Sequence, residues 1–140
     1  MAITGTPPGT AYVVGTFDTK AEELLYVAGL LRAAGLSVVT VDVGTKSPAA
    51  EADVSAQAVA ACHPEGADAV FAAGDRGAAV TAMTEALLRL IATRQDIGGM
   101  IGLGGSGGTS IVAPALRALP IGVPKLMVST LAAGDVGPFV

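Results

Sequence analysis

The sequence contains few of the residues that disulfide scaffolds and nucleic-acid-binding domains require. Cys62 is the one cysteine, so no internal disulfide can form and a secreted disulfide scaffold is excluded. Aromatic residues make up 4% of the chain, tryptophan is absent, and the 8 lysines and arginines form no cluster. We therefore expect no nucleic-acid partner, because such grooves need stacking platforms and a basic surface.

Long apolar segments are also missing. No run approaches the roughly 20 residues that a membrane-spanning helix needs, so no membrane association is expected. Residues 1–10 hold no basic segment followed by an apolar core, which a signal peptide would have. The sequence therefore predicts a cytoplasmic protein.

Charged residues are scarce as well. They make up 14% of the chain, whereas about a quarter is usual for soluble domains, and apolar residues make up 51%. The 140 residues suffice for one domain with its own core. The apolar excess predicts that a second domain or a partner subunit covers part of the surface, and we expect a homo-oligomer.

The chain does contain a series of short apolar runs between helical segments. Residues 1–10 are rich in proline, glycine and threonine and are expected to form a flexible leader, with residues 11–140 as a single nucleotide-binding domain. Four runs predict strands, at 11–15, 37–41, 98–103 and 126–128. Helices are expected at about 20–34, 49–62, 65–73, 75–94 and 109–118. Asp18 or Thr19 is expected to cap the first helix, and Gly35 to end it.

Strands that alternate with helices indicate an α/β fold. We predict a Rossmann-like three-layer domain with a mainly parallel four-stranded sheet in the order 2-1-3-4. In such a sheet ligands bind outside the carboxyl ends of the strands, where the direction of the strand order reverses. The loops at that point are residues 16–20 and 102–110.

The second of these loops holds five glycines between a predicted strand and a predicted helix. Glycines let the backbone approach a bulky anion, and the start of the helix adds unpaired N–H donors and the positive end of a dipole. The alternative is a tight turn that only packs the helix on the strand, but such a turn needs one or two glycines. The loop therefore predicts a site for a phosphate-bearing ligand.

A dinucleotide site is not favoured. Gly102, Gly104 and Gly107 match the pattern G-x-G-x-x-G, which is a weak signal when it stands alone. Such sites also need an acidic residue after the next strand, where this chain has Ser129 and Thr130.

A standard P-loop is not favoured either. The loop nearly fits the pattern, but Gly108 stands in the position of the P-loop lysine. Lys20 on the neighbouring loop could supply the missing charge. The alternative for Lys20 is an exposed lysine in the first turn of a helix.

Acidic residues near the same edge have two interpretations each. Asp18 could bind a sugar hydroxyl or a magnesium ion, or could cap the helix. Asp42 could meet a ribose or base, or be a loop residue. Asp75 with Arg76 could place a guanidinium on a phosphate, or Asp75 could cap a helix that carries a surface arginine. Asp135 could close the rim, or belong to a hinge or an interface.

The remaining reactive side chains suggest no site. His63 precedes Pro64 and is expected in a loop, and Cys62 is expected to serve packing. No pairing of these residues suggests a metal site, a Cys–His nucleophile or a Ser–His–Asp set, so no metal ligand is predicted and catalytic residues stay unassigned.

Four segments together carry a resemblance to a known family. They are residues 15–20 (GTFDTK), 75–80 (DRGAAV), 102–109 (GLGGSGGT) and 127–130 (MVST) with 134–136 (GDV). These segments resemble the Tm-one-like ATP-binding domain family, which includes a plant tobamovirus-resistance protein. The resemblance implies an ATP-binding α/β protein of which this chain is the N-terminal portion, with a missing C-terminal half as its partner. It does not imply antiviral activity, which depends on the partner surface of one plant member.

Together these observations predict ATP binding, with or without Mg²⁺, on the glycine-rich loop. The residues expected to contact the ligand are Thr16, Asp18, Lys20, Gly104, Gly105, Ser106, Gly107, Gly108, Thr109, Ser129 and Thr130. One alternative is half of an active site that acts on a phosphorylated or carboxylated metabolite through Asp18 or Asp135. Another is a module for dimer or partner interaction. Whether the chain is an enzyme is left open.

Overall fold

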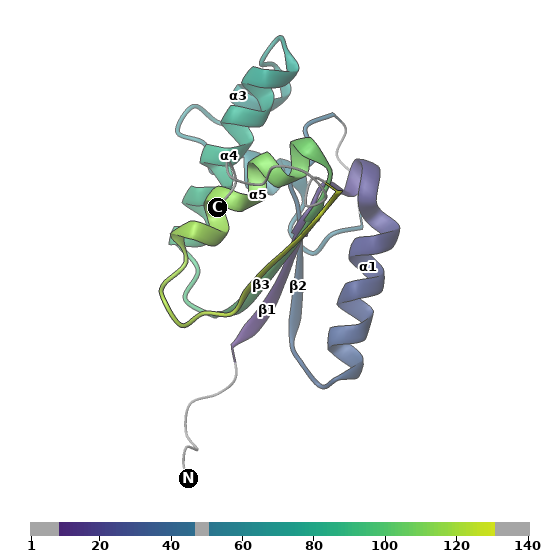
Figure 1. Ribbon diagram of the computed structural model, residues 1–140. Helices are drawn as coiled ribbons and strands as arrows, with labels where there is room; N and C mark the ends of the chain where they lie inside the picture. The colour runs from purple at the N-terminus through teal and green to yellow at the C-terminus, as the bar shows by residue number, and fades with distance from the viewer. Residues whose placement is uncertain (1–8, 47–50, 131–140) are drawn as a thin grey trace.

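The computed structural model describes residues 9–46 and 51–130, and these residues form four strands and five helices (Figure 1). In chain order the elements are β1 (Thr10–Gly15), α1 (Phe17–Ala33), β2 (Val38–Asp42), α2 (Ala56–Ala60), α3 (Asp68–Phe71), α4 (Arg76–Ala92), β3 (Ile97–Gly104), α5 (Ser106–Ala118) and β4 (Lys125–Ser129). Each predicted strand is present, with ends that differ by at most one residue from the prediction.

The four strands form one parallel sheet in the order β2-β1-β3-β4, as predicted. Strand β1 lies inside the sheet and pairs with both β2 and β3. Its side chains alternate between the two faces, and Val13 and Val14 are both fully buried. A strand that is covered on both faces reads as a continuous apolar run, which is the signal that β1 gives in the sequence.

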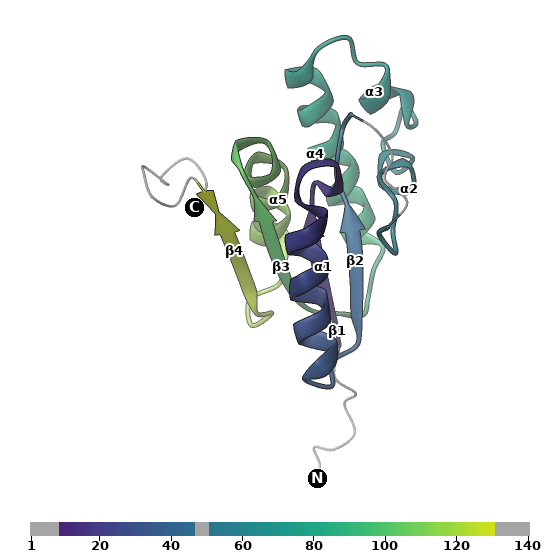
Figure 2. The ribbon, with the colours of Figure 1, turned by 90° about the vertical axis from the view of Figure 1, so that its right-hand side faces the viewer.

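Helices cover both faces of the sheet, so the predicted α/β fold with three layers is confirmed. Helix α1 lies against one face, and α4 and α5 lie against the other (Figure 2). The core on the α1 side consists of Val13, Phe17, Leu24, Ala28 and Leu103. The larger core on the other side includes Tyr12, Val14, Met83, Leu87 and Ile111.

Helix α1 starts earlier than predicted. It begins at Phe17 with Thr16 in the N-cap position, so the prediction that Asp18 or Thr19 caps it is wrong. Lys20 has non-helical backbone angles and kinks the first turn. The predicted end is confirmed: Gly35 has a φ of 91°, and the Gly35 N–H donates to the Arg32 carbonyl at 2.9 Å.

The helix predicted at 49–62 is wrong over much of its length. Residues 47–50 lie outside the described residues, and α2 occupies only Ala56–Ala60. Before it, Val54 forms a parallel bridge with Val41 at the edge of β2. The Asp53 carboxylate accepts hydrogen bonds from the Thr40 N–H (2.9 Å) and hydroxyl (3.1 Å). These contacts with β2 hold the segment extended, and Ser55 then caps α2.

The other helices agree with the prediction except at their ends. Helix α3 is shorter than the predicted 65–73, and α4 is close to the predicted 75–94. Helix α5 begins at Ser106 rather than at 109, and Pro114 lies inside it. Within the described residues, no helix has the length and apolarity that a membrane span requires. Most of the predicted leader lies outside these residues, and β1 already begins at Thr10.

Candidate functional site

The loops at the carboxyl ends of β1 and β3 meet at one cleft. Residues 16–20 follow β1 and form the first turn of α1, whereas Gly105 follows β3 and precedes α5. The two strands are adjacent, with Gly15 beside Leu103, so the loops leave the sheet side by side. Between them lies a cleft of about 260 Å³. The sheet topology therefore brings the two predicted loops together.

Four segments of the chain line the cleft: the start of α1, the segment after β2, the start of α4 and the start of α5. The lining residues are Thr16, Asp18, Thr19, Lys20, Thr45, Lys46, Arg76, Val80, Gly105, Ser106, Gly107, Gly108 and Ile111. The predicted contacts Gly104, Thr109, Ser129 and Thr130 are not among them.

The first turn of α5 offers backbone donors to the cleft. Ser106, Gly107 and Gly108 are the first three residues of this 13-residue helix. The N–H groups at the start of a helix have no partner within it, and the helix dipole makes this end partly positive. The Thr109 N–H donates to the Gly105 carbonyl at 2.9 Å, so the helical hydrogen bonds begin there. An anion in the cleft can accept from the groups that precede it.

The glycines of this loop fall into two groups. A Cβ on Gly102 would lie 2.5 Å from Cγ1 of Val112, and a Cβ on Gly104 would lie 3.0 Å from Cα of Gly108. Both positions are therefore too close to α5 for a side chain. A Cβ on Gly105 or Gly108 would lie at least 3.6 Å from every atom outside the neighbouring backbone, which is an ordinary contact distance. Neither residue has a positive φ. A tight turn thus accounts for Gly102 and Gly104, but not for Gly105 and Gly108, which line the cleft.

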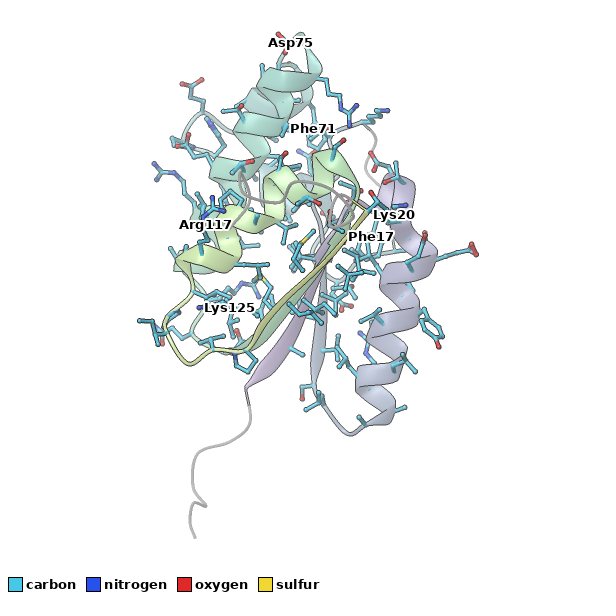
Figure 3. The ribbon with its side chains drawn as sticks, viewed as in Figure 1. Phe17, Lys20, Phe71, Asp75, Arg117 and Lys125 are labelled. Atoms are coloured by element: carbon cyan, nitrogen blue, oxygen red, sulfur yellow. The ribbon has the colours of Figure 1, made fainter. Side chains whose placement is uncertain are left out.

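Arg76, the first residue of α4, is in the lining of the cleft together with the glycine-rich loop. Asp75 caps this helix, because its Oδ1 accepts the Ala78 N–H at 2.8 Å. Figure 3 shows Asp75 at the tip of α4 and Lys20 in the first turn of α1. A Cβ on Gly107 would lie 2.9 Å from Nη2 of Arg76, so the guanidinium reaches over this glycine. The prediction that Asp75 caps the helix is confirmed, and Arg76 lines the cleft, whereas its contact with a phosphate stays a prediction.

Two lysines add positive charge to the cleft. The Lys20 ammonium is 3.9 Å from the Glu23 carboxylate, and such an exposed pair binds it weakly. Lys46 is exposed and follows β2. Sequence reasoning missed Lys46, although the loop after β2 leaves the sheet at the same edge as the other two. Asp18 is the one carboxylate among the described residues that line the cleft.

Asp42 is a structural residue. Its side chain is buried, and its Oδ1 accepts the N–H groups of Phe17 (3.0 Å) and Gly44 (2.8 Å). It thereby ties the start of α1 to the segment after β2. A Cβ on Gly44 would lie 3.0 Å from Cγ of Asp18, so the Asp18 carboxyl packs against this segment. Asp42 is thus the last residue of β2 and not a loop residue, and it is not in the lining of the cleft.

The four predicted residues outside the lining surround the glycine-rich loop. The Thr109 hydroxyl is buried, donates to the Gly105 carbonyl at 2.6 Å and lies 2.6 Å from the Ser129 hydroxyl. Gly104 pairs with Ser129 where β3 and β4 end. Thr130 is exposed, and its Oγ1 would lie 3.7 Å from a Cβ on Gly105. These residues hold the loop from the β4 side.

The other reactive side chains lie away from the cleft. His63 Nε2 is 3.7 Å from Oε1 of Glu85, and the Cys62 thiol donates to the Ala58 carbonyl at 3.6 Å. Asp135 lies outside the described residues. In the described part of the chain, no group of three or more His, Cys, Asp or Glu side chains could hold a metal ion.

A family model matches almost the whole chain. It is described as the N-terminal domain of the uncharacterised protein family UPF0261, and it covers residues 9–140. The chain belongs to this family. The resemblance seen in the sequence is confirmed, including the position of the chain at the N-terminal part of its relatives.

The relatives come from bacteria and from a plant. A UPF0261 protein of Rhizobium meliloti is 57% identical over 129 residues, which cover 92% of this chain and 32% of the relative. A UPF0261 protein of Clostridium tetani is 38% identical over 132 residues, which cover 91% of this chain and 33% of the relative. The chain therefore spans about a third of the length of these bacterial relatives.

The plant relative is the ToMV resistance protein Tm-1 of Solanum lycopersicum. It is 35% identical over 148 residues, which cover 92% of this chain and 20% of the relative. A ToMV susceptible protein of the same plant is 34% identical over 148 residues. Similarity of this degree thus occurs with both plant proteins and does not by itself indicate resistance.

Proposed function

We propose that this chain binds ATP, with the phosphates on the first turn of α5. The observation that carries the proposal is the charge of the cleft. The chain has a net charge of −4, yet among the described residues Lys20, Lys46 and Arg76 line the cleft together with a single carboxylate, Asp18. A cleft whose charge is opposite to that of the whole chain concentrates anions.

The donor geometry supports phosphate in particular. The first turn of α5, with its backbone N–H groups, and Arg76, whose guanidinium reaches over Gly107, line the same cleft. Arginine binds phosphate oxygens through two parallel hydrogen bonds, which a lysine cannot do. The hydroxyls of Thr16 and Ser106 lie in the same lining. A phosphate group would thus be contacted both by backbone N–H groups of α5 and by the Arg76 guanidinium.

The apolar part of the lining supports a nucleotide over a simple phosphate. Val80 and Ile111 are in the cleft beside the charged groups. The volume of about 260 Å³ is slightly below the roughly 300 Å³ at the lower end of ligand pockets. The phosphates would fill it, and the ribose and base would extend over Val80 and Ile111 toward the open side. In the longer relatives, further chain could complete that side.

Asp18 fits a limited role in magnesium binding. Mg²⁺ in nucleotide sites is bound through one or two carboxylates together with phosphate oxygens and water. One carboxylate lines the cleft, so the site could hold the ion beside bound phosphates, where Mg²⁺ would neutralise phosphate charge. We expect Mg²⁺ to bind measurably only in the presence of the nucleotide.

Calorimetric titration with ATP and Mg²⁺ tests the proposal. Arg76→Ala should weaken binding about 10- to 100-fold, because a hydrogen bond to a charged group contributes about 1.5–3 kcal/mol. Arg89→Ala is the matched control. Arg89 is an exposed arginine on the same helix, it pairs with Glu85, and it is not in the lining of the cleft. Equal affinities of the two variants would contradict the proposed site.

Half of an active site for a phosphorylated or carboxylated metabolite is the second candidate. The basic lining would also bind a carboxylate, and the chain spans only 32% of its Rhizobium relative. This candidate is favoured over a nucleotide site if ATP does not bind, inorganic phosphate does bind, and Arg76→Ala abolishes the binding of phosphate.

A further inference from the structure

One face of the sheet is only partly covered within the described residues. Helix α1 lies in front of β1 and β2 in Figure 2 and also packs on Leu103 of β3, but no described helix lies in front of β4 on that side. The reason is topological. Helix α5 connects β3 to β4 through a right-handed crossover, which places it on the same side as α4.

The side chains on this open surface are apolar. Ile101 pairs with Leu126, and Leu103 pairs with Val128, so these four side chains point to one face. That face is the α1 side, because Leu103 belongs to the same core as Phe17. Leu126 is 56% exposed and Val128 is 49% exposed.

A groove runs along the same surface toward the end of α1. It has a volume of about 400 Å³, and its lining includes Leu31, Leu36, Ile101, Pro124 and Leu126. Lys125 is the one charged residue in the lining of this groove among the described residues. We call the surface formed by Leu36, Ile101, Leu126 and Val128 the β3–β4 face.

An uncovered face of this kind is a liability for a free domain. Strand β4 is at the edge of the sheet, and native proteins protect edge strands with charged side chains, proline or a covering element. Leu126 and Val128 instead continue an apolar surface, and contiguous surfaces of this type mark interaction sites. The β3–β4 face therefore has the character of an interaction surface.

We propose that the polypeptide following this N-terminal domain in family-length proteins covers the β3–β4 face. About two thirds of the length of the bacterial relatives lies outside the matched region, since the match covers 32% and 33% of them. The family model is that of an N-terminal domain, so additional chain follows it. A domain tethered in the same chain is present at an effective concentration in the millimolar range. A second copy of the chain has no such tether, so the following polypeptide is the favoured occupant. The proposal does not depend on nucleotide binding.

Thiol labelling tests this docking directly. The 140-residue chain would be compared with a family-length hybrid, in which the chain replaces the matched region of the Rhizobium meliloti relative. Leu126→Cys places a thiol on the β3–β4 face, and Ile121→Cys, at a fully exposed position, is the matched control. Alkylation rates at each position would be read by peptide mass spectrometry, with Cys62 as an internal reference and circular dichroism as a check of folding.

The expected result is a rate at position 126 that falls at least tenfold in the hybrid, with no change at position 121. Equal rates at position 126 in both proteins would overturn the proposal. A slow, concentration-dependent rate in the 140-residue chain would also overturn it, because a second copy would then be the occupant. If the hybrid fails to fold, the Rhizobium protein with cysteines at the aligned positions gives the same comparison.

Discussion

Individual glycines of the 102–108 loop have different roles. Gly102 and Gly104 are needed because α5 packs directly on their backbone. Gly107 leaves space for the Arg76 guanidinium, whereas Gly105 and Gly108 leave space at the cleft itself. A substitution at one of these glycines can therefore affect the stability of the fold and the affinity for a ligand differently.

Gly108→Ala should stabilise the protein and weaken ATP binding. Gly108 is helical, and its Cβ would lie in ordinary contact, 3.8 Å from Cγ2 of Thr16, so alanine should raise the free energy of unfolding by about 0.4–1 kcal/mol. The same methyl crowds the cleft, at a cost of about 1 kcal/mol or more in binding. Gly29→Ala is the control, since Gly29 is in α1 and a Cβ there meets nothing within 4 Å. Denaturant unfolding and calorimetry should show stabilisation in both variants and weaker binding in Gly108→Ala alone.

At the scale of the elements, Asp42 determines how α1 and β2 meet. Its carboxylate receives the first N–H group of α1 and the N–H group of Gly44, and both hydrogen bonds are buried. Lys20 comes three residues after Phe17, and Lys46 comes two residues after Gly44. The Asp42 side chain therefore holds together the two segments that carry these lysines of the cleft.

Asp42→Ala should lower the free energy of unfolding by about 1–3 kcal/mol for each buried donor left without its acceptor. Asp75→Ala is a useful comparison, because it removes an exposed cap and should cost about 0.5–2 kcal/mol. Chemical denaturation measures both. A cost for Asp42→Ala no greater than that of Asp75→Ala would show that the Asp42 hydrogen bonds contribute little.

At the scale of the whole molecule, Tyr12 links the first strand to the segment before β3. Its hydroxyl donates to Oδ1 of Asp96 at 2.7 Å, and Nη1 of Arg94 donates to the hydroxyl at 3.3 Å. Burial, and then the hydrogen bond to Asp96, raise the pKa of Tyr12 above its ordinary value. The folded state therefore retains the phenolic proton more strongly than the unfolded chain does.

The sign of this shift predicts alkaline sensitivity. The stabilisation is fully present below the unfolded pKa of about 10 and is lost as the pH rises through the folded pKa. The difference in unfolding free energy between the wild type and Tyr12→Phe should therefore shrink above about pH 10. Tyr26→Phe is the control, because Tyr26 is 68% exposed. Denaturant unfolding at several pH values measures the effect, and a constant difference for Tyr12→Phe would contradict it.

Much of the fold and part of the candidate site could be predicted from the sequence. The strands β1 to β4 are short apolar runs, and the handedness of their connections leaves few possible strand orders. The same topology places residues 16–20 beside Gly105. The segment at 51–55 could not be predicted, because its alanine-rich surroundings favour a helix and only pairing with Thr40 and Val41 holds it extended.

The sequence by itself determined the order of the elements, the parallel sheet and the glycine-rich loop at its carboxyl edge, because these follow from local patterns and from the chirality of the chain. Only the tertiary structure decided that Arg76 and Lys46 join this loop, that Thr109 and Ser129 hold it from the β4 side, and that no other described residue covers the exposed side chains of Leu126 and Val128. These features depend on contacts between residues far apart in the chain, which no local pattern specifies.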